Sequence, residues 1–202
     1  RDPGGPESAT LRGQADRLAL RLANHDETLH ARLRPLDSRA ADVFEAVEQA
    51  RVEAVGSQSL AGVRANMGAA LLTRLEKMGA LRATEAERVP VAEAVALLVR
   101  ERLTGQRTPD GAAAMLDLVR TAMEDKAGAR LNALAEVADD QVAFAERLKD
   151  VLRALDLDPG DGRGDDASDE QGEDDPDPQS PDAADEQDEE DDAGGGEGQT
   201  MD

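Results

Sequence analysis

The stretch DSRAADVFEAVEQARVEAVG, residues 37–56, has the features of one complete helix. Asp37 or Ser38 can cap its first turn, because a short polar side chain accepts hydrogen bonds from amides that lack an intrahelical partner. Gly56 stands where many helices end in a left-handed residue. Apolar residues recur on one side at helical spacing, namely Val43, Phe44, Val47, Ala54 and Val55. The stretch therefore predicts a helix with one buried face.

The same signals recur along the chain and predict about seven helices. A first helix begins at Ser8 and buries a stripe of residues spaced by three or four: Leu11, Ala15, Leu18, Leu22, His25 and Leu29. The later helices span about 59–79, 90–105, 108–128, 131–137 and 140–155, with Gly79, Gly105 and Gly128 as expected ends. We find no alternating strand pattern, and only two aromatic residues. The predicted fold is an all-α bundle of six or seven helices.

Charge divides the chain into unequal parts. Residues 158–202 hold 20 acidic side chains and one basic one, Arg163, so they carry 19 of the 22 net negative charges. A segment this polar cannot bury enough apolar surface to offset chain entropy. We predict a flexible lead at 1–7, a helical domain at 8–157 and a disordered acidic linker at 158–202. The linker is either a self-repelling spacer or a patch that docks on a basic partner.

Composition excludes several classes of function. A net charge of −22 opposes binding to nucleic acid or to anionic membranes. The longest apolar run, residues 94–99, is far shorter than the ~20 residues of a membrane span. The chain has no cysteine, which suits a cytoplasmic protein and excludes thiolate chemistry. It begins at Arg1 and ends at Asp202 just past an acidic run, so we expect a piece of a longer protein.

No residue pattern predicts a catalytic, cofactor-binding or metal site. His25 and His30 are the only histidines, and on one helix a five-residue separation sets them about 140° apart, which prevents a shared ligand face. We expect His25 to be half-buried and His30 to face solvent. The acidic run at 156–166 misses the calcium-loop spacing and is interpreted as a flexible joint. No phosphate-binding loop with Lys and Ser/Thr is present.

Five charged residues on well-patterned helices are candidates for partner binding: Glu48, Arg51, Arg100, Glu101 and Arg102. We expect these side chains to be exposed and to contribute to docking. The alternative is that these residues form a solvated helix surface. In that case Glu48 and Arg51 are an ordinary i, i+3 pair, and Arg100 and Arg102 complement the dipole at the end of their helix.

Three stretches in order, followed by the acidic tail, carry a family resemblance: RGQADRLALRLANHDETLHARLRPLD (12–37), DVFEAVEQARVEAVG (42–56) and VRERLTG (99–105). Together they resemble the T subunit (CobT) of the cobaltochelatase of aerobic cobalamin biosynthesis. The resemblance implies an accessory subunit of a ligase that forms nitrogen–metal bonds. That complex uses ATP and Mg²⁺ to insert its substrate Co²⁺ into hydrogenobyrinic acid a,c-diamide.

The resemblance also implies two partners, an AAA+ ATPase subunit and a large corrinoid-binding subunit. In the family, a von Willebrand A-type domain with a D-x-S-x-S metal motif follows the acidic linker. The nearest string here, DASDE at 166–170, lacks the second serine, so no metal residue carries over. We expect no bound cofactor and no activity from this chain alone. The alternative interpretation is a helical adaptor or chaperone-like binding module with an acidic arm, and an enzyme acting alone ranks third.

Overall fold

The computed structural model describes residues 6–160, which form seven α-helices and no strand. The helices are α1 Pro6–Asn24, α2 Glu27–Leu33, α3 Ser38–Gly56, α4 Ala61–Lys77, α5 Val91–Thr104, α6 Asp110–Leu134 and α7 Gln141–Ala154. Short 3₁₀ turns lie at Ala80–Arg82 (η1), Ala86–Arg88 (η2) and Ala135–Val137 (η3). The predicted all-α bundle is confirmed for these residues. Most of the predicted disordered linker, residues 161–202, lies outside them.

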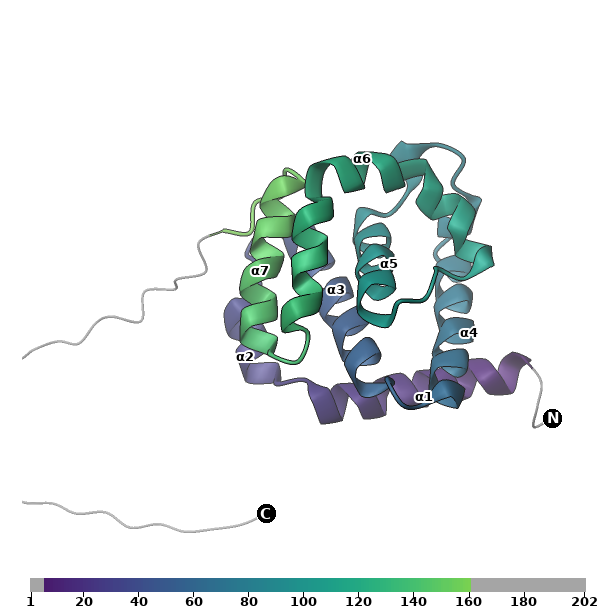
Figure 1. The fold of residues 1–202 in the computed structure, drawn as a ribbon. Helices are drawn as coiled ribbons and strands as arrows, with labels where there is room; N and C mark the ends of the chain where they lie inside the picture. The colour runs from purple at the N-terminus through teal and green to yellow at the C-terminus, as the bar shows by residue number, and fades with distance from the viewer. Residues whose placement is uncertain (1–5, 161–202) are drawn as a thin grey trace, which may run out of the picture. The chain divides into compact units, whose positions relative to one another are not determined.

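Helices α3 and α5 form the centre of the bundle. They pack on each other, and in Figure 1 α4 lies to one side of them and α7 to the other, while the long helix α6 crosses above them from the α4 side to the α7 side. Helix α5 is buried over seven consecutive residues, 93–99, because neighbours cover it on nearly every side. The largest buried apolar side chains of α3 and α7 are Phe44 and Phe144. The centre of the bundle thus contains residues 37–56, the stretch with the clearest helix pattern in the sequence.

Capping explains the ends of several helices as predicted. The Asp37 carboxylate accepts a hydrogen bond from the Ala40 amide at 2.9 Å and caps α3. Asp140 caps α7 in the same way, accepting from the Val142 and Ala143 amides. Gly79 and Gly105 follow α4 and α5 in the left-handed conformation, at φ 75° and 67°.

The predicted helix end at Gly56 is confirmed, but its expected left-handed conformation is wrong, and the predicted stop at Gly128 is wrong. Gly56 is the last residue of α3 and is not left-handed; its missing side chain leaves room for Leu20 of α1, which would lie 2.6 Å from an added Cβ. Gly128 lies inside α6, which continues to Leu134. A glycine within a helix costs only about 1 kcal/mol, and burial of Leu131 and Leu134 outweighs that cost. The predicted fifth and sixth helices are therefore one.

The predicted first helix is two helices. Helix α1 ends at Asn24, and Asp26 caps α2 by accepting a hydrogen bond from the Leu29 amide at 2.9 Å. A short polar side chain that can cap a new helix competes with continuation of the old one. The chain therefore turns at His25 and Asp26, which changes where the two histidines lie.

The predicted buried face of α1 is also wrong, because the helix packs through its opposite side. Gly13 is buried against the backbone of α4, where an added Cβ would lie 2.2 Å from the Asn66 carbonyl oxygen. Nearby, the Asn66 side chain donates a hydrogen bond to Asp16 at 3.1 Å. Because α1 can approach α4 this closely only where it has no side chain, α1 packs through its small and polar side. Its leucine stripe is left facing solvent.

We expect Gly13→Ala to loosen α1 from α4. The added methyl group would collide with rigid backbone, so the variant should lose about 1–3 kcal/mol of unfolding free energy despite a better helix propensity. Gly68→Ala in α4 is the matched control, since its Cβ would meet nothing within 4 Å and should gain up to about 1 kcal/mol. Urea unfolding measures both. Equal stabilisation by the two substitutions would contradict this packing.

Candidate partner-binding surfaces

Glu48 and Arg51 are buried, so the expectation that they are exposed is wrong. Each is only 2% exposed. The Arg51 guanidinium donates to both carboxylate oxygens of Glu48, at 2.8 and 2.7 Å, and lies over the Phe144 ring at 5.8 Å from its centroid. It also donates to the Asn24 carbonyl at 2.8 Å and to the Ala138 carbonyl at 3.1 Å. This pair joins the end of α1, the middle of α3 and the segment before α7.

Arg100, Glu101 and Arg102 are half-buried, and each is paired with another helix. Arg100 donates to Glu53 of α3 at 2.6 Å, and Arg102 donates to Glu124 of α6 at 2.5 Å. Glu101 accepts two hydrogen bonds from Arg120 of α6, at 2.7 and 3.0 Å. These pairs attach α5 to its neighbours. A docking role for the five charged residues stays a prediction, since no partner is present.

Glu101 has the best-defined electrostatic environment of the five. Hydrogen bonding from Arg120 lowers the pKa of Glu101 from 4.5 to about 2, although burial acts in the opposite direction. The Thr108 amide, which donates to the same carboxylate at 2.8 Å, lowers the pKa further. The folded chain therefore stabilises the charged form of Glu101 at neutral pH.

A cleft of about 440 Å³ lies among α1, α3, α4 and α5. Its charged lining pairs internally. Glu53 bridges Arg17 of α1, at 3.2 Å, and Arg100 of α5, and Arg74 of α4 pairs with Glu93 of α5. Because each of these arginines faces a carboxylate that lines the same cleft, little uncompensated charge remains for an ionic ligand. The cleft is better explained as a helix junction than as a cofactor site.

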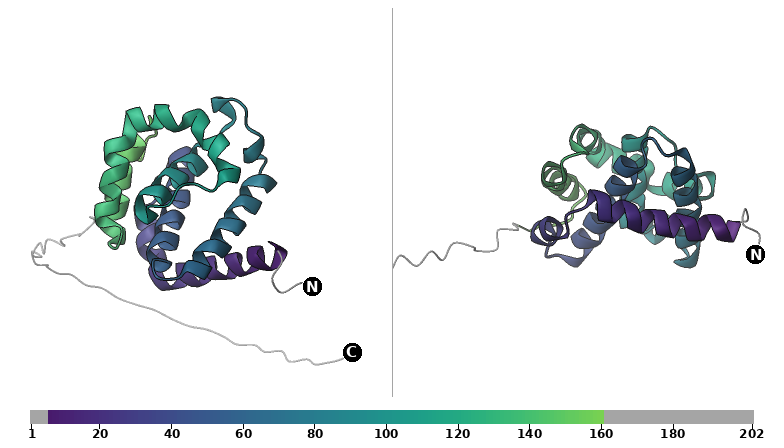
Figure 2. Two further views of the ribbon diagram at one scale, coloured as in Figure 1. Left: turned by 45° about the vertical axis from the view of Figure 1, so that its right-hand side comes forward. Right: turned by 90° about the horizontal axis from the view of Figure 1, so that it is seen from below.

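An apolar stripe runs along the outside of α1, formed by Leu11, Ala15, Leu18 and Leu22; we call it the α1 stripe. Its leucines are 62%, 61% and 80% exposed. Figure 1 shows α1 lying across one edge of the helical domain, and in the right-hand view of Figure 2 it lies in front of the other helices. Single exposed leucines are ordinary, but a contiguous apolar row on one helix is typical of a protein–protein contact.

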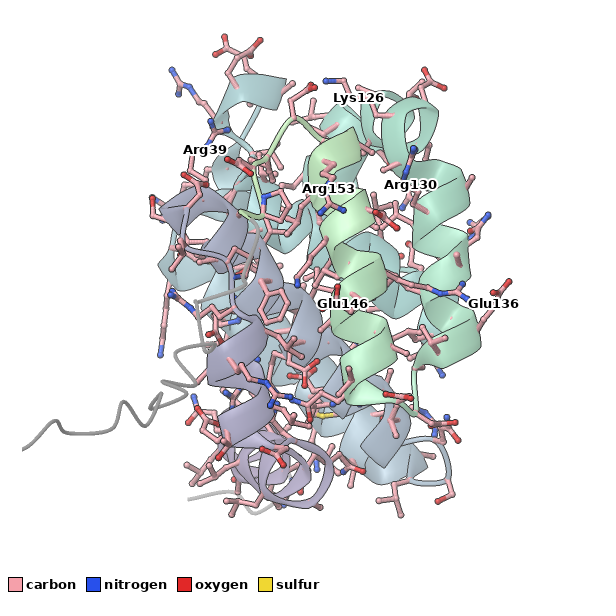
Figure 3. The ribbon with its side chains drawn as sticks, turned by 90° about the vertical axis from the view of Figure 1, so that its left-hand side faces the viewer. Arg39, Lys126, Arg130, Glu136, Glu146 and Arg153 are labelled. Atoms are coloured by element: carbon pink, nitrogen blue, oxygen red, sulfur yellow. The ribbon has the colours of Figure 1, made fainter. Side chains whose placement is uncertain are left out.

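The surface of α6 and α7 differs from the α1 stripe. Figure 3 shows its charged side chains, among them Glu136, Glu146 and Arg153, extending outward. Several pair locally, as Glu136 does with Arg147 at 2.8 Å, with side chains 69% and 42% exposed. Pairs of this kind contribute little to stability or to binding. That surface has the properties of a solvated face.

The prediction that His30 faces solvent is wrong, because it is buried. His25 is half-buried as a whole residue, as predicted, and its side chain is only 1% exposed. The two rings lie 4.7 Å apart, because the turn at Asp26 brings them together. The angular argument against a shared ligand face assumed one continuous helix and does not hold. The capping preference of Asp26 was the sequence signal that could have revealed the turn.

These features define an all-α domain that is held together by buried ion pairs and that leaves one apolar helix face open. A family model described as Cobalamin biosynthesis protein CobT matches residues 1–202, so the chain belongs to the CobT family. This gives it a role in cobalamin biosynthesis as a subunit of cobaltochelatase, with partner subunits. No solved structure matches the chain. Within residues 6–160 no helix is long and apolar enough to cross a membrane.

We expect Glu101→Gln to destabilise the domain in a pH-dependent way. Above pH 4.5 the charged carboxylate contributes in full, and the loss on substitution should be about 1.5–3 kcal/mol. As the pH falls from 4.5 through about 2, Glu101 itself becomes protonated and the difference between variant and parent should shrink. Urea unfolding at pH 7 and pH 3 measures this difference.

Asp117→Asn is the matched control, since Asp117 pairs with the same Arg120 at 3.3 Å but is mostly exposed. It should change stability by less than about 1 kcal/mol. Equal losses for the two variants, or a loss at Glu101 that does not depend on pH, would contradict the assignment.

Proposed function

We propose that this chain is an accessory subunit of ATP-dependent cobaltochelatase, and that the α1 stripe binds the AAA+ ATPase subunit. The complex inserts Co²⁺ into hydrogenobyrinic acid a,c-diamide on a large corrinoid-binding subunit. Family membership supports the general role. The observation that carries the docking proposal is the exposure of Leu11, Leu18 and Leu22 on one face of α1.

The spacing of the stripe suits recognition of a helix by a groove. Positions 11, 15, 18 and 22 follow the i, i+4, i+7, i+11 pattern of an amphipathic helix whose apolar face enters a partner. Full burial of one leucine side chain is worth about 1.5–3 kcal/mol, so three of them can dominate the energy of a contact. Because the opposite side of α1 packs on α4 and α3, binding need not open the bundle.

The charged residues are weaker candidates for this contact. Arg51 and Glu48 cannot reach a partner without unfolding their surroundings, and Arg100, Glu101 and Arg102 already pair within the domain. A partner that recruited them would first have to break those pairs. An exposed apolar face can bind a partner without breaking any ion pair of the domain.

The proposed contribution of the chain is assembly rather than chemistry. Its sequence contains no phosphate-binding loop, so we assign ATP and Mg²⁺ to the AAA+ subunit and the corrinoid to the large subunit. The isolated chain should neither hydrolyse ATP nor insert cobalt. Residues 158–202 are proposed to act as an acidic linker.

We expect Leu18→Glu with Leu22→Glu to weaken binding to the AAA+ subunit by about 100-fold or more, since two buried apolar contacts would be lost and two charges desolvated. The melting temperature should hardly change, because both side chains are exposed in the free chain. Leu36→Glu is the control; Leu36 is 88% exposed and lies between α2 and α3, away from the stripe. Pull-down titrations measure the affinity, and thermal melts the melting temperature, of the parent, the double variant and Leu36→Glu.

Unchanged binding to the AAA+ subunit would remove the α1 stripe as its docking surface. Loss of binding to the large subunit alone would also contradict the proposal and assign the stripe to that contact. A similar loss with Leu36→Glu would indicate a nonspecific effect of charge.

A further inference from the structure

The turn between α1 and α2 brings two histidines against a glutamate of α3. His25 lies in the turn, His30 in α2 and Glu48 in α3, and each offers one ligand atom so that the three atoms lie within 4.8 Å of one another. All three side chains are almost fully buried, with 1%, 4% and 3% of their surface exposed. The cluster is separate from the α1 stripe.

Both imidazole rings have an unsatisfied nitrogen. His30 Nε2 lies 2.6 Å from the Glu45 carboxylate, whereas the Nδ1 atom of the same ring is buried without a hydrogen-bond partner in the described structure. His25 Nδ1 lies 2.7 Å from Glu48 Oε1. Its Nε2 atom lies 3.0 Å from a Glu27 oxygen but is not aligned for a hydrogen bond. An unpaired buried nitrogen is costly, so His30 Nδ1 is available to a ligand. On the His25 ring the ligand atom is Nδ1, which lies beside Glu48 and 3.4 Å from the Gln141 amide nitrogen.

Two imidazoles and a carboxylate form a ligand set for a transition-metal dication. Zn²⁺ and Co²⁺ accept nitrogen and oxygen ligands at about 2.0–2.2 Å, and three such protein ligands leave a position for water. We propose that His25, His30 and Glu48 bind one such ion. The cation takes the place of the proton between His25 Nδ1 and Glu48 Oε1, which lie 2.7 Å apart. On binding, these two atoms move to roughly 3.3 Å, the distance between two ligand atoms of a tetrahedral metal ion.

The surroundings suit ligands of this kind. A ligating histidine commonly donates its other ring N–H to a carboxylate, and Glu45 occupies that position for His30. Arg51 holds the Glu48 carboxylate with two hydrogen bonds, which fixes its orientation. Arg51 is also a cation beside the site. The nearby carboxylates of Glu27 and Glu45 compensate its charge, although each of them also has an arginine within 3.4 Å.

Metal binding at this site should depend on pH. The ligand nitrogens must be unprotonated, and the ion displaces the proton of the His25–Glu48 hydrogen bond. Affinity should therefore fall as the pH is lowered, because protons compete with the ion for both ring nitrogens. Binding should also raise the melting temperature, because the three ligands come together only in the folded chain.

The acidic tail is the main source of interference in a test. Its carboxylates favour Mg²⁺ and Ca²⁺, so a large excess of Mg²⁺ should occupy them without displacing a nitrogen-bound ion. The chain contains only two histidines, so ring-¹⁵N labelling of the full chain reports on this site alone.

The experiment titrates the labelled chain with Zn²⁺ in excess Mg²⁺ at pH 7.5, and with Co²⁺ for visible absorption. We expect both histidine rings to shift in one saturable event at one ion per chain. His30→Gln should weaken binding at least about 10-fold, and Glu45→Gln should weaken it about 10–100-fold through the orientation of His30. Glu136→Gln is the control, an exposed carboxylate on η3 that should leave affinity unchanged.

Three results would overturn the site: no ring shift up to millimolar Zn²⁺, a shift of one ring only, or equal affinity for the parent and Glu45→Gln. Glu45 is 41% exposed, so its variant stays informative even if His30→Gln fails to fold. Because the readout involves no partner subunit, its failure leaves the docking proposal untouched, and the reverse also holds.

Discussion

The buried ion pair of Arg51 and Glu48 is the constraint on which the arrangement of the helices depends. A guanidinium removed from water must find a partner for nearly every N–H group, because an unpaired buried charge costs several kcal/mol. Arg51 meets this need with Glu48 and with the carbonyl groups of Asn24 and Ala138. The end of α1 and the segment before α7 are thereby held at the middle of α3. The same pair positions Glu48 beside His25, so the histidine cluster depends on it too.

Much of the fold could be predicted from sequence because its signals are local. Asp37 and Asp140 cap helices as their side-chain chemistry requires, and Gly79 and Gly105 follow helices in a conformation that glycine adopts most readily. The errors arose where contacts between helices, and not local sequence, decide where a helix ends or which side of it is buried. Gly128 marks no helix end because buried leucines follow it, and periodicity identified the stripe on α1 without showing that α1 packs through Gly13 on its other side.

The candidate sites were harder to predict for a related reason. A charged i, i+3 pair has the same sequence pattern on a solvated face and inside a bundle, so Glu48 and Arg51 gave no sign of their burial. The proximity of His25 to His30 followed from a turn that a single aspartate initiates. The charged residues and the apolar row of α1 thus have the opposite roles from those expected. Most of the charged candidates hold helices together, and an apolar row expected in the core is available to a partner.

The unfolding free energy of Arg51→Gln, measured by urea denaturation beside partner binding, tests this account most directly. The account predicts a loss of about 3–5 kcal/mol, because Glu48 would be left buried without its cation. Arg153→Gln, whose exposed pair with Asp150 spans one helical turn, should lose less than about 1 kcal/mol. If Arg51→Gln kept the stability of the parent and lost affinity for the AAA+ subunit, Arg51 would be a docking residue, and the structural role assigned to the pair would be wrong.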